Sequence, residues 1–198
     1  MKKYILFLPA LIICLLIPAC SAPSGCRIDG TVRDVSFEGK TVYLRDVYNR
    51  SVIYDSVQVV QGKFHFTDSM DIASPYMRLL SLPAHESGAY ELPVVMENGH
   101  ITAALGEIVC TSGTPLNDRL QDFLLGMDEF LDSMHKEKDW SEERMKARFS
   151  EFIEGHVTTN ADNMAGVYIY RIYHRFLADE AGQSLLDKHP LLKEQVEK

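Results

Sequence analysis

Apolar and polar residues alternate with a period of two through residues 26–109. Such alternation predicts β-strands, because successive side chains of a strand point to opposite faces of a sheet. Turn-forming residues interrupt the pattern at close intervals, as at Gly39, Asn49 and Gly62. The pattern therefore predicts seven or eight short strands, an arrangement typical of an antiparallel β-sandwich or an open barrel.

Residues 51–66 give the clearest local signal within this region. Val57 and Val59 precede Gln61-Gly62, and Phe64 and Phe66 follow it. A two-residue loop that ends in glycine favours a β-hairpin, since glycine adopts a positive φ without a Cβ clash. The spacing predicts that Val59 pairs with Phe64 and Val57 with Phe66. Asn98-Gly99 predicts a second tight turn, between strands at 92–96 and 100–105.

The period changes to that of a helix after residue 112. Thr114 is suited to an N-cap, and Pro115 to the first helical position, where its missing N–H costs nothing. Apolar residues then recur three and four positions apart: Leu116, Leu120, Phe123, Leu124, Met127, Phe130, Leu131 and Met134. Ser141 is expected to cap a second helix, and Gly166 lies in an apolar third helix at 162–177, where it indicates close backbone packing.

The expected fold class is therefore α+β. We expect an antiparallel β domain over residues 26–112, followed by a helical subdomain of three or four helices over 113–198.

The first nineteen residues form a secretory signal. Lys2 and Lys3 precede an apolar stretch over 4–17 that is short for a membrane span. The alternative is a short signal anchor. Residues 17–20 read Ile-Pro-Ala-Cys and resemble the bacterial lipobox, in which the cysteine is lipidated. The resemblance implies a lipoprotein signal peptide at 1–19, lipidation of Cys20, a tether at 20–25 and a periplasm-facing position in the cell envelope.

The chain is acidic. Its formal net charge is -8, and removal of Lys2 and Lys3 with the signal leaves 18 basic against 28 acidic residues, or -10. This balance argues against nucleic acid as a partner.

Two cysteines remain after Cys14 and Cys20 are set aside. Cys26 and Cys110 would lie in an oxidising compartment, where they can form one disulfide or stay buried and inert. The sequence does not decide between these alternatives. No CxxC motif occurs in the 198 residues.

The sequence carries no catalytic motif. The seven histidines have no metal-ligand spacing, so we expect neither a metal nor another cofactor, and we do not expect an enzyme. His174 fits a packing role better than a ligand or acid–base role. Asp-Ser followed by an aliphatic residue or Met occurs at Ser56, Ser69 and Ser133 and resembles an acceptor sequence for bacterial O-glycosylation. The alternative there is ordinary turn and strand-edge chemistry.

Several motifs occur in a recognisable order: the lipobox, Ile28-Asp29-Gly30, Asp55-Ser56-Val57, Gly62-Lys63-Phe64, Met96 to Gly99, and SGTPLN at 112–117. This order resembles the domain of unknown function at the N-terminus of Bacteroidetes-type thiol–disulfide oxidoreductase lipoproteins. The resemblance spans most of residues 26–120. In longer relatives a thioredoxin-like domain with CxxC follows. The resemblance implies a fold and a compartment. It does not imply catalysis, because the CxxC cysteines of the thioredoxin-like domain have no counterpart in these 198 residues.

These observations favour a lipid-anchored, periplasm-facing, non-catalytic binding or docking module. Expected partners are the membrane, through the N-terminal lipid, and a thioredoxin-like or other envelope protein. One alternative is an accessory component of a thiol-redox system that uses Cys26 and Cys110. Another is a structural envelope protein without a ligand.

Overall fold

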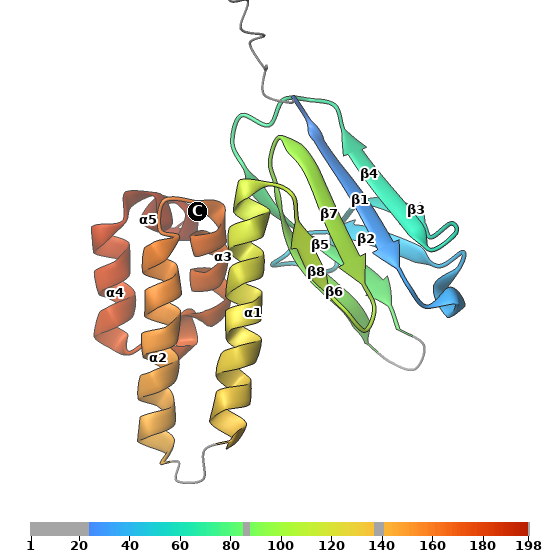
Figure 1. The fold of residues 1–198 in the computed structure, drawn as a ribbon. Helices are drawn as coiled ribbons and strands as arrows, with labels where there is room; N and C mark the ends of the chain where they lie inside the picture. The colour runs from blue at the N-terminus through green and yellow to red at the C-terminus, as the bar shows by residue number, and fades with distance from the viewer. Residues whose placement is uncertain (1–23, 85–87, 137–140, 198) are drawn as a thin grey trace, which may run out of the picture.

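The computed structural model describes residues 24–84, 88–136 and 141–197. Within these ranges eight strands are followed by five α-helices, which confirms the expected α+β class (Figure 1). The strands are β1 (Cys26–Val32), β2 (Thr41–Arg45), β3 (Ile53–Gln58), β4 (Lys63–Asp68), β5 (Tyr76–Pro83), β6 (Ala89–Met96), β7 (Gly99–Leu105) and β8 (Cys110–Ser112).

The strands form a sandwich of two four-stranded sheets. One has the order β4-β1-β7-β8 and the other β3-β2-β5-β6. Every pairing is antiparallel except that of β1 with β7, which is parallel and in register from Cys26 and Gly99 to Val32 and Leu105. Alternate side chains of both sheets fill the space between them, including Ile28, Leu80 and Leu92, which are fully buried.

The predicted hairpin at 51–66 is wrong beyond its turn. Gln61 and Gly62 both have positive φ, at 52° and 68°, as a tight turn requires. The pairing between the flanking segments, however, is an isolated bridge of Val60 with Lys63. β3 then pairs with β2 in one sheet, and β4 pairs with β1 in the other. The predicted pairs of valine with phenylalanine therefore do not form: the valines and the phenylalanines enter the core from opposite sheets.

The second predicted turn behaves in the same way. Gly99 has a φ of 133°, but β6 and β7 belong to different sheets. The Asn98 side chain holds this corner, because its Oδ1 accepts hydrogen bonds from the amides of Gly25 (2.9 Å) and Ile72 (2.8 Å).

The helices form a third layer. They are α1 (Pro115–Lys136), α2 (Glu142–Thr159), α3 (Met164–Tyr173), α4 (Asp179–Lys188) and α5 (Pro190–Glu197). These five helices of the described ranges are one more than the largest number expected, because α4 and α5 are separate helices on either side of His189. The layer packs on the outer face of the second sheet, where Met77, Leu79 and Val95 join the helical core. No helix in the described ranges is both long enough and apolar enough to cross a membrane.

Local helix signals are largely confirmed. Ser141 Oγ accepts a hydrogen bond from the amide of Arg144, as its N-cap assignment requires. A Cβ atom on Gly166 would lie 2.1 Å from the carbonyl oxygen of Asn160, so only glycine fits this contact between α3 and the end of α2. Thr114 occupies the N-cap position, as expected, since α1 begins at Pro115 and the amide of Asp118 donates to the Thr114 carbonyl. The capping side chain is a different one: the Thr114 hydroxyl accepts from the side chain of Asn117, and the Glu97 carboxylate accepts from the amides of Leu116 and Asn117.

Asn117 joins the helical layer to the sandwich. It is fully buried at the start of α1, and its amide group faces the edge of β6. Its Oδ1 accepts from the amide of Val95 (3.0 Å), and its Nδ2 donates to the carbonyl of Val95 (2.7 Å). The side chain thus replaces a neighbouring strand on an edge that would otherwise leave backbone groups unpaired.

Candidate functional site

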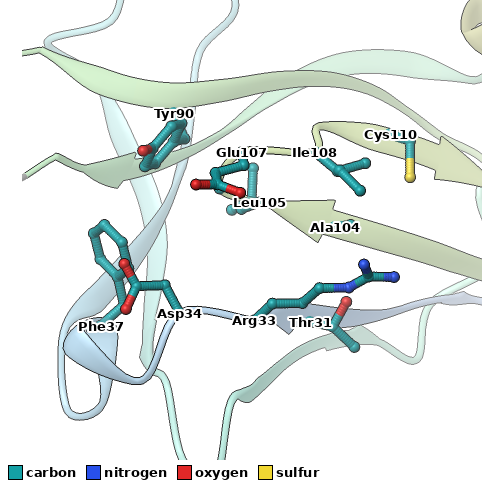
Figure 2. Close-up of a pocket in the computed structure, with 11 residues that line it drawn as sticks. Thr31, Arg33, Asp34, Phe37, Tyr90, Ala104, Leu105, Glu107, Ile108 and Cys110 are labelled. Atoms are coloured by element: carbon teal, nitrogen blue, oxygen red, sulfur yellow. The ribbon is translucent and has the colours of Figure 1, made fainter.

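A cavity of about 360 Å³ opens at the end of the sandwich where β1 and β7 finish and β8 begins. We call it the β7–β8 cavity (Figure 2). Short segments that are far apart in sequence build it: 31–34 with Phe37, the start of β6 at Tyr90, and 104–110. The fold brings these segments together because β1 and β7 run parallel and end on the same side.

The apolar part of the lining is aromatic and aliphatic. Phe37 is buried, and its ring lies edge-to-face with Tyr90 at a centroid distance of 5.8 Å. Ile108, in the loop before β8, is 53% exposed and leaves a large apolar side chain at the mouth. Figure 2 shows the two rings at one end of the cavity and the Cys110 sulfur at the other, with Glu107 between them.

Charges of both signs surround this apolar surface. Arg33, Asp34 and Glu107 line the cavity, and all three are exposed. Asp34 also fixes the local backbone, since its Oδ1 accepts from the amide of Ser36 (2.8 Å) at the start of the 3₁₀ turn Val35–Phe37. An apolar surface with a few convergent polar groups is the usual lining of a ligand site. The mixed charges suit a ligand that carries both polar and apolar groups.

The disulfide between Cys26 and Cys110 does not form: both thiols are free. Cys26 begins β1, whereas Cys110 pairs with Ala104, which in turn lies beside Thr31 near the far end of β1. Cys26 and Thr31 are five residues apart along β1, which separates the two cysteines by roughly 16 Å in the strand direction. A disulfide needs Cα atoms closer than about 7 Å. Of the two alternatives left open by the sequence, free cysteines describe this structure.

The two thiols have different surroundings. Cys26 is buried, and desolvation raises the pKa of its thiol to about 11. Cys110 is half-buried and lines the β7–β8 cavity. Neither cysteine has the other as a resolving partner, so the described residues contain no dithiol.

The other predicted sites are scattered. Ser56 lies on β3, Ser69 just after β4 and Ser133 in α1, and all three are exposed. Their hydroxyls are accessible, but only Ser69 lies outside a strand or helix. Cys20 lies outside the described residues. The structure brings none of the three serines to the β7–β8 cavity.

The histidines of the described ranges do not form a metal site. No group of three or more metal-ligating side chains is present in residues 24–84, 88–136 and 141–197. His174 is exposed, and its ring stacks on Tyr170 with centroids 5.8 Å apart. His100 Nε2 lies 2.6 Å from Asp29 Oδ2 on the outer face of the first sheet. Desolvation by itself would raise the pKa of the Asp29 carboxyl, but hydrogen bonds from Arg27 and His100 outweigh it and lower this pKa.

Apart from Cys110, the sequence analysis did not single out the residues that line the cavity. The period of two assigned Ala104 and Leu105 to a strand and gave no signal for Glu107 as a site residue. One signal was present: Ile108 is a large apolar residue directly after Gly106 and Glu107.

The β-sandwich and the start of α1 match a known family. Residues 26–120 match the model described as "Domain of unknown function (DUF4369)". The matched segment includes Asn117, so it contains both the sheets and the side chain that closes the β6 edge. It also contains all the residues that line the β7–β8 cavity. Neither the curated proteins nor the solved structures gave a match.

Proposed function

We propose that this protein is a non-catalytic binding module of the bacterial cell envelope, anchored by a lipid on Cys20, and that its ligand occupies the β7–β8 cavity. The observation that carries the proposal is the cavity itself, which joins an aromatic pair, an exposed isoleucine and charges of both signs. The lipobox-like residues 17–20 and the resemblance to N-terminal domains of thioredoxin-like lipoproteins support the envelope location.

The position of Cys110 provides a direct test. A ligand in the cavity should cover this thiol, so its alkylation by a maleimide should be slower in native envelopes than in purified protein. Peptide mapping by mass spectrometry separates Cys110 from the other cysteines. Charge reversal by Arg33→Glu should remove the protection if the ligand uses this end of the cavity. Equal alkylation rates in envelopes and in purified protein would exclude a bound ligand there.

Cys26 is an internal control in the same experiment. A thiol with a pKa of about 11 is about 0.1% thiolate at pH 8, and its burial also excludes the reagent. We therefore expect Cys26 to react only after unfolding in urea, whether or not a ligand is present.

The main rival is an accessory role in thiol–disulfide exchange. Such exchange needs an attacking thiolate and a nearby resolving thiol, and the separation of Cys26 from Cys110 argues against that pair. We expect no reduction of insulin by dithiothreitol above background. Turnover that disappears in a Cys26→Ser, Cys110→Ser double variant would favour the redox role over the binding role.

A further inference from the structure

The edge strands on the two sides of the sandwich have different surroundings. On one side α1 covers both sheet edges: Asn117 pairs with the backbone of Val95 in β6, and Gln121 Oε1 accepts from the amide of Thr111 in β8 (2.8 Å). β3 and β4 form the two remaining edges, on the side away from the helices (Figure 1). They separate directly after the bridge between Val60 and Lys63.

A cleft of about 260 Å³ lies where β3 and β4 have separated. We call it the β3–β4 cleft. Its floor is part of the sandwich core and includes Leu44, Phe66 and Met96, each of which is at most 8% exposed. On the β3 side Tyr54 is 51% exposed, and its neighbour Ile53 is 48% exposed. An open strand edge with large exposed apolar side chains is a template for pairing with another chain.

The mouth of the cleft is acidic. Asp55 of β3 and Asp68 of β4 line it together with Arg78. The Arg78 guanidinium lies over the rings of Tyr54 (3.7 Å) and Tyr76 (4.4 Å) and donates to the carbonyl of Met77, so it is already engaged. Two carboxylates against one guanidinium leave a formal charge of -1 in the lining, on a chain whose net charge is -8.

Asp55 also protects the open edge. Its Oδ1 accepts a hydrogen bond from the amide of the next residue, Ser56, at 2.7 Å. On this edge strand the amide of Ser56 thus has a side-chain acceptor. An arriving strand could replace the carboxylate as acceptor, which would free Asp55 to pair with a cation.

We propose that the β3–β4 cleft binds an extended segment of another polypeptide, with alternating apolar and basic side chains, as an added strand on β3. A carbonyl of the segment accepts from the Ser56 amide, and a basic side chain pairs with Asp55. An apolar side chain of the segment enters the cleft above Phe66. Backbone bonds supply part of the affinity and the alternate side chains supply specificity, as in other cases of strand addition. This site is separate from the β7–β8 cavity.

Binding of a defined peptide tests the proposal. The probe is a fluorescein-labelled hexapeptide of alternating valine and lysine, and its binding to the full-length protein is followed by fluorescence anisotropy. We expect it to bind at least about tenfold more tightly than the same peptide with glutamate in place of lysine, because opposite charges favour the complex and like charges oppose it. A valine–lysine peptide N-methylated at alternate residues should lose binding, since it keeps the charge but lacks backbone donors.

A pair of protein variants locates the site. Asp55→Asn should weaken binding about fivefold, the loss expected for one partly exposed ion pair. Asp132→Asn removes the same charge from an exposed position on α1 and should change the affinity less than about twofold. Hydrogen exchange of the Ser56 amide should slow when the peptide binds.

Three results would overturn the proposal: no binding of the valine–lysine peptide up to about 1 mM, equal binding of its N-methylated form, or equal losses in Asp55→Asn and Asp132→Asn. The last result would show attraction to the net charge of the protein and not to the cleft.

Discussion

At the scale of single residues, Asn117 connects the two layers of the molecule. Its amide group matches both the donor and the acceptor of Val95, and it also accepts from Thr111 Oγ1 and donates to Thr114 Oγ1. A buried side chain that satisfies backbone groups is costly to remove, because those groups then lie unpaired away from water. The stability of the β6 edge therefore depends strongly on one amide.

Asn117→Ala should lower the free energy of unfolding by about 2–4 kcal/mol, since it leaves the amide and carbonyl of Val95 unsatisfied and opens a small cavity. Urea unfolding followed by circular dichroism measures the change. Gln58→Ala, at an exposed position on β3, is the control and should change stability by less than about 0.5 kcal/mol. A loss of similar size in both variants would contradict the role given to Asn117.

The sequence could not predict this role. Asn117 drew attention only as part of the SGTPLN motif, and its partner Val95 lies twenty-two positions earlier. The capping side chain could not be predicted for the same reason: Thr114 occupies the N-cap position, but the carboxylate that accepts from the first helical amides is that of Glu97 at the β6–β7 corner. Local signals identify where a helix begins, whereas long-range contacts decide which side chain caps it.

At the scale of elements, the two glycine-containing turns were found but the pairing around them was not. A positive φ at Gly62 or Gly99 is a local property that residue type predicts. Whether the flanking strands then pair or enter opposite sheets depends on the core. Here Val59, Phe64 and Phe66 are all buried in the core between the two sheets. β3 therefore joins one sheet and β4 the other.

Two helical glycines provide a matched test of element packing. Gly166→Ala should destabilise the protein by at least about 2 kcal/mol, because the new methyl group would overlap the Asn160 carbonyl and force α3 away from the end of α2. Gly155→Ala, in α2, meets no atom within 4 Å and should stabilise the protein by about 0.5–1 kcal/mol through better helix propensity. Thermal unfolding of both variants measures the difference. Equal effects of the same sign would show that the contact at Gly166 is not a constraint.

At the scale of the whole molecule, the helical layer covers one face and one side of the sandwich, whereas the β7–β8 cavity and the β3–β4 cleft remain open. The residues around each opening come from distant parts of the chain. The cavity, for example, is lined by residues from 31–34, by Phe37 and Tyr90, and by residues from 104–110. Motif spacing in the sequence therefore could not reveal it, although the fold class could be predicted from the change of period alone.

The envelope location is tested through Cys20. Replacement by alanine removes the residue that the lipobox resemblance assigns to the lipid, so Cys20→Ala should no longer incorporate labelled palmitate and should leave the membrane fraction or remain unprocessed. Cys26→Ser is the control and should still be labelled. Labelled palmitate in Cys20→Ala, at the level of the unaltered protein, would contradict lipid anchoring at this position.

The central claim is that the β7–β8 cavity is where this protein binds its ligand, and site-specific photocrosslinking in intact cells tests it most directly. A benzophenone amino acid at Ile108 lies at the cavity mouth, and one at Leu125 lies on α1 with almost equal exposure, 53% against 52%. The account predicts a discrete crosslinked product from position 108 that Arg33→Glu abolishes, and none from position 125. No product from 108, or the same products from both positions, would contradict it.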